Sequence, residues 1–211
     1  TMAFLSRRNE DDRNQLYTIR IDGGEAERLT TMPLGIFAPK WFPDGKRIAF
    51  ASNILPEIEN DFEAFEKELK SRKESKVTAK VTENRYYRYW DTWLTDGYVT
   101  HLYSYDLASK ERTDLTPGLT QLLTFGSGID YDISPDGNTI AISKNVTEPP
   151  YHEKFNFDIF LYSSDGKGEM ENITAENPAM DSSPMFTPDG KYLLFLQRVH
   201  PDKLAENNKI V

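Results

Sequence analysis

The residues of this chain best suited to binding another molecule lie in one aromatic stretch, RYYRYWDTWLTDG, at positions 85–97. Tyr89, Trp90 and Trp93 provide large flat rings, and Asp91 places a carboxylate among them. A carboxylate surrounded by aromatic rings can bind an organic cation, such as a free amino group, through charge-assisted hydrogen bonds and cation–π attraction. The same rings could instead pack this stretch against a neighbouring surface. Both interpretations follow from the residue types.

No catalytic nucleophile can be assigned. The chain has no cysteine and no Gly-x-Ser-x-Gly motif, the turn that presents the serine of many hydrolases. In FGSGID, glycines flank Ser127 directly, which is not that spacing. A catalytic histidine needs a nucleophile and an orienting carboxylate within reach, and no such set can be read around His101, His152 or His200.

Three aspartates near residue 130 could supply oxygen ligands to a calcium ion: Asp130, Asp132 and Asp136. Their spacing does not match the EF-hand loop, and Asp136 belongs to a turn motif described below. We therefore assign no metal site and no cofactor.

Composition narrows the class of protein. Of the 211 residues, 38% are apolar and 12% aromatic, enough to form a hydrophobic core. With 25 basic and 34 acidic residues the net charge is −9, which argues against nucleic-acid binding. No apolar run is long enough to span a membrane, and the first residues lack a signal-peptide pattern. The sequence does not assign the cellular compartment: a cytoplasmic location and a periplasmic or secreted location are both compatible with it.

A repeat shows how the chain is organised. WFPDGKRIAF, ISPDGNTIAI and FTPDGKYLLF begin at Trp41, Ile133 and Phe186, and each joins a Pro-Asp-Gly turn to an alternating apolar stretch. Proline presets the second position of a type I turn, and glycine takes the fourth without steric cost. The apolar residues that follow lie two apart, as one buried face of a strand requires. Each repeat therefore predicts a β-hairpin.

A second element, ending at Thr30, Thr116 and Thr174, adds a strand, a polar turn and a short charged strand to the pattern. Hairpin and second element together make four antiparallel strands, and the turn aspartates at 44, 136 and 189 recur after 92 and then 53 residues. A period of roughly fifty residues built from four strands is typical of β-propeller blades. We predict an all-β fold, a partial β-propeller of about three blade-equivalents with one helical insertion, forming a single domain over residues 1–211.

The first interval exceeds the second by 39 residues (92 − 53), which predicts an insertion at residues 54–98 within one blade. A helix is predicted from about Pro56 to Lys73, with four apolar residues on one face: Ile58, Phe62, Phe65 and Leu69. The alternation at residues 77–81, formed by Val77, Ala79 and Val81, predicts a short strand after it. The helix needs a surface to rest on, and it could also contact another domain.

Both chain ends fall inside predicted blades, because residues 2–8 match the second strand of a blade and residues 207–211 match the start of a third. Propellers close with roughly four to eight blades, and an open arc would expose unpaired strand edges and apolar faces. We expect the chain to be a segment of a larger propeller. A small protein that closes its ring by self-association is the alternative.

The stretches YRYWDTWLTDGYVTHLYSYDL and GIDYDISPDGNTIAISKN, with the turn repeats, resemble the amino-terminal propeller of the prolyl oligopeptidase family of serine peptidases. Within that family they are most similar to the dipeptidyl-peptidase V and acylaminoacyl-peptidase branch. The turn repeats are shared with many propellers, so residues 85–107 carry most of the specificity. The resemblance implies a propeller in front of an α/β-hydrolase domain with a Ser-Asp-His triad, where the propeller limits access to short peptides and binds their amino end.

The resemblance further implies that this chain is a propeller segment of a serine exopeptidase, inactive alone because it lacks the nucleophile. Its partners would be short peptides and a carboxy-terminal hydrolase domain of the same protein, and Tyr89, Trp90, Asp91 and Trp93 would bind the peptide amino group. A non-enzymatic propeller resembling TolB, which mediates protein interactions, is the alternative, and the long insertion argues against it. A propeller glycosidase would need two suitably spaced carboxylates, which the sequence cannot pair.

Overall fold

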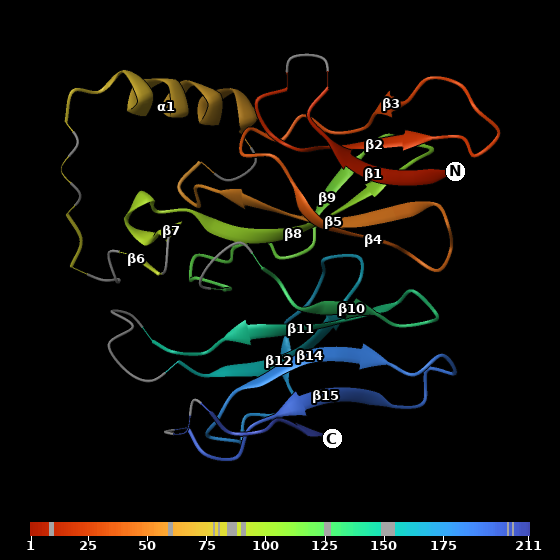
Figure 1. The fold of residues 1–211 in the computed structure, drawn as a ribbon, viewed down its shortest axis with the longest axis vertical. Helices are drawn as coiled ribbons and strands as arrows, with labels where there is room; N and C mark the ends of the chain where they lie inside the picture. Colours follow the sequence, from red (N-terminus) through yellow and green to blue (C-terminus); the bar gives the residue numbers. More distant parts are fainter. Residues whose placement is uncertain are drawn as a thin grey trace.

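The computed structural model shows four antiparallel sheets stacked one after another along the long axis of the molecule, with a helix and a two-stranded hairpin at one side (Figure 1). The structure describes residues 1–8, 11–58, 61–77, 79, 81–83, 88–89, 92–124, 128–148, 155–201, 203 and 205–211. Within these ranges, the side chains of residues 89, 92 and 95 are not described.

In every sheet the strands lie in chain order. The first sheet contains β1 (Met2–Ser6), β2 (Gln15–Ile19) and β3 (Glu27–Arg28). The second contains β4 (Phe37–Trp41), β5 (Arg47–Ile54), β8 (Val99–Asp106) and β9 (Arg112–Asp114). The third contains β10 (Tyr131–Ile133), β11 (Thr139–Asn145), β12 (Phe157–Ser163) and β13 (Glu171–Asn172). The fourth contains β14 (Asp181–Phe186), β15 (Leu193–Gln197) and β16 (Lys209–Ile210). The predicted all-β fold of antiparallel blades is confirmed.

The Pro-Asp-Gly turns join the first two strands of the second, third and fourth sheets, as predicted. In the first of these turns the N–H of Gly45 donates to the carbonyl of Phe42 at 3.0 Å, and Gly45 has a φ of +65°. That left-handed conformation is costly for a residue with a Cβ. Asp44 accepts a hydrogen bond from the N–H of Lys46 at 2.8 Å, which closes the turn.

Successive turns pack against one another. A Cβ placed on Gly137 would lie 3.7 Å from Cδ of Pro43, and one placed on Gly190 would lie 3.7 Å from Cδ of Pro135. Arg47 also donates to the carbonyl of Gly137 at 3.5 Å. The turns therefore follow one edge of the stacked sheets, on the right in Figure 1, which we call the turn edge.

The recurring threonine fixes the end of each outer strand. In three sheets its hydroxyl oxygen accepts a hydrogen bond from a backbone N–H of the preceding strand, so a side chain extends the ladder where strand pairing ends. The three bonds are Leu16 to Thr30 (2.9 Å), Leu102 to Thr116 (3.1 Å) and Ile159 to Thr174 (2.9 Å).

β5 is buried on both faces, whereas its alternating pattern predicted one buried face. Ile48 and Phe50 are fully buried, and so are Ala49 and Ala51 between them. Ile48 and Phe50 belong to an apolar cluster shared with the first sheet, while the alanines belong to one shared with the third sheet. A sheet stacked between two others has no face left for water.

The chain between the neighbouring strands β5 and β8 forms helix α1 (Phe62–Glu74), β6 (Arg88–Tyr89), β7 (Thr92–Trp93) and a 3₁₀ turn, η1 (Leu94–Asp96). The helix begins at Phe62, not near Pro56 as predicted, because Asp61 caps it by accepting a hydrogen bond from the N–H of Ala64 at 3.0 Å. Neither α1 nor any other described helix has the length and apolar character needed to cross a membrane.

The strand predicted at residues 77–81 is wrong. The described residues of this stretch are not in a strand, and Val77 and Val81 are 76% and 81% exposed. Alternating apolar residues form a strand only when a partner strand and a covering surface are present, and here the described side chains face solvent.

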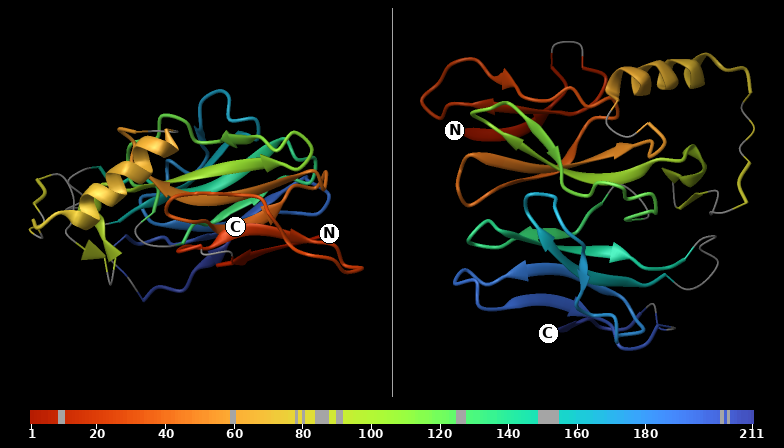
Figure 2. Two further views of the ribbon diagram at one scale, coloured as in Figure 1. Left: turned by 90° about the horizontal axis from the view of Figure 1, so that it is seen from above. Right: turned by 180° about the vertical axis from the view of Figure 1, so that it is seen from behind.

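Helix α1 is anchored near both of its ends. Phe65 is fully buried against the first two sheets. The guanidinium of Arg112, from β9, lies 3.8 Å from the centre of the Phe62 ring, and Arg72 donates to the carbonyl of Asp96 at 2.6 Å. The helix lies at the edge opposite the turn edge (Figure 2), which we call the insertion edge.

Candidate functional site

The aromatic stretch is only partly described by the structure. Trp90 and Asp91 lie outside the described residues, and the side chain of Tyr89 is not described although its backbone lies in β6. Trp93 is 49% exposed, and the guanidinium of Arg88, its partner across the β6–β7 pair, lies 5.6 Å from its ring centre. The Trp93 ring therefore already has a cation beside it, and amine binding by this stretch stays a prediction.

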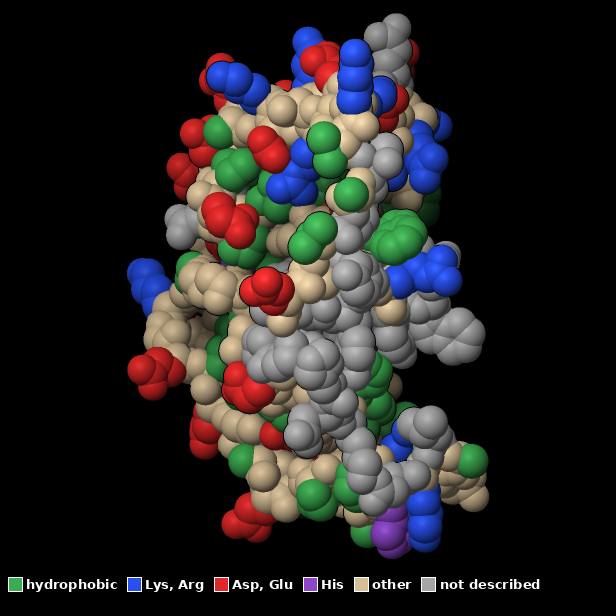
Figure 3. Space-filling model, turned by 90° about the vertical axis from the view of Figure 1, so that its left-hand side faces the viewer, with side chains coloured by type: hydrophobic (Ala, Val, Ile, Leu, Met, Phe, Trp, Pro, Cys, Tyr) green, Lys and Arg blue, Asp and Glu red, His purple; other side chains and the backbone are tan. Residues whose placement is uncertain are grey.

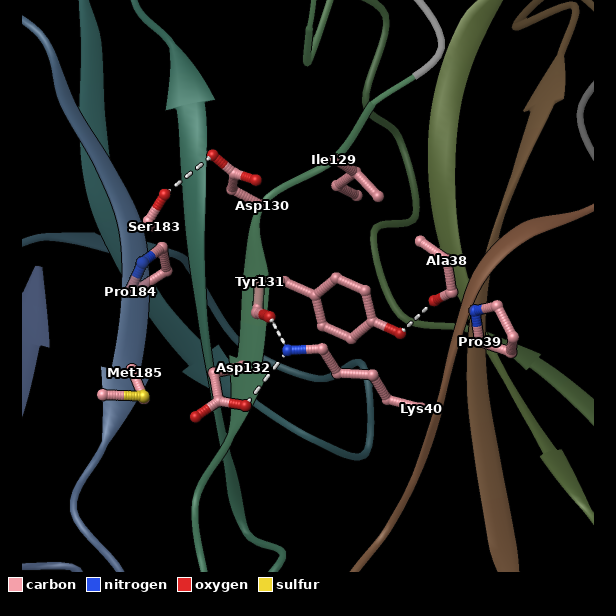
Figure 4. A pocket seen from close by; sticks show the side chains of 10 residues that line it. All are labelled: Ala38, Pro39, Lys40, Ile129, Asp130, Tyr131, Asp132, Ser183, Pro184 and Met185. Atoms are coloured by element: carbon pink, nitrogen blue, oxygen red, sulfur yellow. Dashed lines mark hydrogen bonds and ion pairs between the residues drawn. The ribbon is translucent and has the colours of Figure 1, made fainter. Parts of the chain in front are cut away.

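A second candidate site lies where the first strands of three sheets meet. It is an open groove of about 440 Å³ between β4, β10 and β14 (Figure 4). Each strand contributes the residues three, four and five places before its turn proline. They are Ala38, Pro39 and Lys40 from β4, Asp130, Tyr131 and Asp132 at β10, and Ser183, Pro184 and Met185 from β14, with Ile129 beside them.

Two of these strands carry a bulge at the same place. Ala38 and Ser183 have φ values of 49° and 54°, and the pairing register shifts at both. Such a conformation costs a residue with a Cβ about 1–3 kcal/mol. In each case proline follows, at Pro39 and Pro184, where the pairing is interrupted and a backbone N–H would have no ladder partner.

Tyr131 occupies the position that proline has in the other two strands. It is 3% exposed, and its hydroxyl donates to the carbonyl of Ala38 at 2.6 Å. A tyrosine hydroxyl from the third sheet thereby donates the hydrogen bond that the Ala38 carbonyl accepts at the bulge of the second sheet. Burial raises the pKa of Tyr131 well above its ordinary value, so it stays a neutral donor.

Asp132 connects three sheets. Its Oδ1 lies 3.2 Å from Nζ of Lys40 in the second sheet, and its Oδ2 accepts a hydrogen bond from the N–H of Phe186 in the fourth at 2.9 Å. The Lys40 ammonium also donates to the carbonyl of Tyr131 and lies 4.9 Å from the centre of the Tyr131 ring. Both charges of this ion pair are therefore engaged within the protein.

Asp130 differs from Asp132 in having almost no partner. It is exposed, and its one described side-chain contact is a long one, 3.5 Å from Ser183 Oγ to Oδ2. Figure 4 shows it away from the Lys40–Asp132 pair, toward Ser183. Asp130 also lines an adjoining hollow of about 230 Å³, formed with Thr124, Gly128, Ile129, Ser143, Phe157, Met180 and Ser182.

The three aspartates weighed as calcium ligands have separate roles. Asp136 lies in its turn, where it accepts hydrogen bonds from the hydroxyl of Ser134 and the N–H of Asn138, which lower its pKa. Asp132 is paired with Lys40. Among the described residues no group of three or more His, Cys, Asp or Glu side chains has the arrangement of a metal site.

The described histidines have structural partners. His101 is buried on β8, with Nδ1 2.8 Å from Asp114 Oδ2 and Nε2 2.8 Å from the carbonyl oxygen of Leu119. These contacts join β8 to β9 and to the segment that follows. His200 lies 2.6 Å from Glu206 and lowers the pKa of that carboxyl to about 2. His152 lies outside the described residues.

Two solved structures have a similar fold. The acylaminoacyl peptidase of Pyrococcus horikoshii superposes on 99% of this chain with a TM-score of 0.59 and 15% identity, over 28% of its own length. A TolB-like protein from Agrobacterium tumefaciens superposes on 96% of the chain, with a TM-score of 0.53 and 19% identity, over 51% of its own length. The four stacked sheets are therefore an arc of β-propeller blades, and this likeness shows the fold alone.

Sequence similarity identifies the kind of propeller. Dipeptidyl-peptidase 5 of Porphyromonas gingivalis is 26% identical to this chain over 244 aligned positions, covering 92% of the chain and 34% of the relative. The resemblance to the amino-terminal propeller of the prolyl oligopeptidase family, in its dipeptidyl-peptidase V and acylaminoacyl-peptidase branch, is confirmed. The chain spans about a third of that relative's length. No protein-family model matches the chain.

Proposed function

We propose that this chain forms part of the propeller of a serine exopeptidase, where it restricts access to short peptides and positions their amino end. The catalytic triad would lie in an α/β-hydrolase domain of the same protein. The similarity to dipeptidyl-peptidase 5 over 92% of the chain supports a peptidase-related propeller.

The observation that carries the positioning role is the groove between the first strands of three blades. In a propeller the first strands surround the central channel, so a molecule passing along the channel would meet this surface. β4, β10 and β14 are each the terminal strand of their sheet, with no strand paired to the other edge among the described residues. An extended peptide can pair with the free N–H and C=O groups of such an edge.

The insertion edge is the surface we assign to the hydrolase domain. Helix α1 lies across the first two blades there, and its outer face is exposed and carries both signs of charge: Glu63, Glu66, Lys67, Lys70, Lys73 and Glu74. Figure 3 shows Lys, Arg, Asp and Glu side chains at the upper end of this edge. A polar face of mixed charge suits contact between domains, because such interfaces are more polar than a protein core.

The test is a length series of substrates given to the intact protein that contains this chain. Peptides of about four residues and a folded protein with the same first four residues are compared for release of amino-terminal fragments. We expect cleavage of the short peptides and no cleavage of the folded protein. Equal cleavage of both would contradict gating, and an intact protein that cleaves neither but retains a protein partner would favour the TolB-like alternative.

A further inference from the structure

We propose that Asp130 selects for a positive charge in the peptide, by binding an ammonium group of an extended chain lying in the groove of β4, β10 and β14. This inference rests on the proposed function and names the chemistry of its ligand. An ammonium group can come from the free amino terminus or from a lysine side chain. Both offer the same three N–H donors.

The position of Asp130 is the first argument. It lines both the groove of about 440 Å³ and the adjoining hollow of about 230 Å³. Among the described residues, the two hollows share one other residue, Ile129. A peptide extending from one hollow into the other would therefore pass Asp130, whichever of its ends enters first.

The charges in the groove are the second argument. Lys40 is its one described cation, and that ammonium is already paired with Asp132 and with the carbonyl of Tyr131. Asp132 in turn has Lys40 on one oxygen and the N–H of Phe186 on the other. Of the two described carboxylates in the groove, only that of Asp130 has no described cation within ion-pair distance. The groove has one unbalanced negative charge, and a peptide cation would complement it.

The apolar surroundings are the third argument. Ile129, Pro184 and Met185 border the same groove, and Met185 is 55% exposed. A peptide covering these side chains would exclude water beside Asp130 and strengthen the ion pair, because Coulomb attraction grows as the local dielectric constant falls. Methionine adapts to differently shaped neighbours, so the groove would tolerate varied side chains while discriminating on charge.

The experiment measures peptide binding to the intact protein by isothermal titration, after a fluorophosphonate has inactivated any serine hydrolase site so that the peptides persist. The probes are tetra-alanine with a free amino terminus, its N-acetylated form, and the acetylated form with lysine at the second position. Wild type, Asp130→Asn and Glu171→Gln are compared. Glu171 lies exposed on β13, the outermost strand of the same blade, so its substitution makes the same change in net charge far from the groove.

We expect the wild type to bind at least one ammonium-bearing peptide more tightly than the acetylated tetra-alanine, by about three- to tenfold. Asp130→Asn should abolish that difference, and Glu171→Gln should preserve it. Preference for the free-amine peptide would assign the ammonium to the amino terminus, and preference for the lysine peptide would assign it to a side chain. Discrimination that survives in Asp130→Asn would overturn the assignment of Asp130. A wild type that binds none of the peptides would instead contradict the proposed function.

Asp130→Lys provides an independent check. Its ammonium should weaken binding of the preferred cationic peptide further than Asp130→Asn does, while the acetylated tetra-alanine should bind as it does to wild type. Folding is followed by the thermal midpoint, which should change little because the one described side-chain hydrogen bond of Asp130 is 3.5 Å long. Equal binding of the cationic peptide by the Asn and Lys variants would contradict the electrostatic argument.

Discussion

The carboxylate of Asp132 accepts a hydrogen bond from the N–H of Phe186 at 2.9 Å, so a side chain of the third blade pairs with the backbone of the fourth. Its other oxygen faces Lys40 of the second blade at 3.2 Å. One residue in the groove thus links three blades. Asp130, two residues earlier, makes only a long contact to the fourth blade, 3.5 Å from Ser183 Oγ, among the described residues.

Asp132→Ala should therefore destabilise the arc, because it removes the acceptor of the Phe186 N–H and the carboxylate paired with the Lys40 ammonium. We expect a loss of about 1–3 kcal/mol in the free energy of unfolding, measured by urea denaturation. Asp130→Ala is the matched control, with an expected change within about 0.5 kcal/mol. Equal losses from the two variants would show that Asp132 does not link the blades.

Tyr131→Phe removes only the hydroxyl that donates to the carbonyl of Ala38 at 2.6 Å. Because Tyr131 is buried, the carbonyl at the bulge would lose its partner without gaining water, at an expected cost of about 1–3 kcal/mol. Tyr192→Phe is the control, since Tyr192 is 68% exposed. If both variants unfold at the same urea concentration as wild type, the hydroxyl does not support the bulge.

Asp181 and Asp189 should give the protein's stability opposite dependences on pH. Burial raises the pKa of Asp181 above its ordinary value of 3.8. Asp181 therefore contributes its full stabilisation below pH 3.8, where its carboxyl is protonated. This contribution is lost as the pH rises through the higher pKa that Asp181 has in the folded protein. Asp181→Asn removes the buried charge, so it should be at least as stable as wild type near pH 7, with any advantage shrinking toward about pH 3.

The hydrogen bond from the Thr187 hydroxyl lowers the pKa of Asp189 below 3.8. The ionised carboxylate of Asp189 therefore contributes to stability above pH 3.8. This contribution is lost as the pH falls through the lowered pKa that Asp189 has in the folded protein. Asp189→Asn should thus be less stable than wild type near pH 7, with a deficit that shrinks on acidification. Urea denaturation of both variants at about pH 7 and about pH 3 checks the two signs, and a deficit for Asp181→Asn near pH 7 would refute the burial argument.

Arg112→Lys keeps the charge but removes the planar group that lies 3.8 Å from the Phe62 ring centre. The stacking is worth about 0.5–2 kcal/mol, so helix α1 should open more often. Hydrogen exchange should become faster in residues 62–74 and stay unchanged in β5 and β8. Arg20→Lys, on a side chain 75% exposed, is the control. Unchanged exchange in the helix would show that the stack does not anchor it.

The features that the sequence predicted correctly are set by short-range chemistry. Pro43, Asp44 and Gly45 determine a turn among themselves, and the strands beside that turn pair without reference to the rest of the chain. Counting these hairpins and the closing threonines was enough to predict antiparallel blades. The spacing of apolar residues does not determine where α1 starts; Asp61, whose capping role is equally local, sets its start at Phe62.

The groove was not predicted, because its contacts depend on how separate blades stack. Lys40 and Asp132 lie 92 residues apart, and nothing in either repeat shows that their side chains meet. A signal was present: proline at the fourth position before the turn proline, at Pro39 and Pro184, extends the repeat upstream. Reading that extension would have placed Asp130 and Asp132 at positions equivalent to Ala38 and Lys40.

The most direct measurement is a crystal structure of the intact protein with a peptidyl phosphonate bound covalently at its hydrolase serine. We predict that the peptide amino end lies in the propeller channel against β4, β10 and β14, with the hydrolase domain contacting the insertion edge. A peptide that enters from outside the propeller and makes no contact with these strands would contradict the account, as would an intact protein with no hydrolase domain to label.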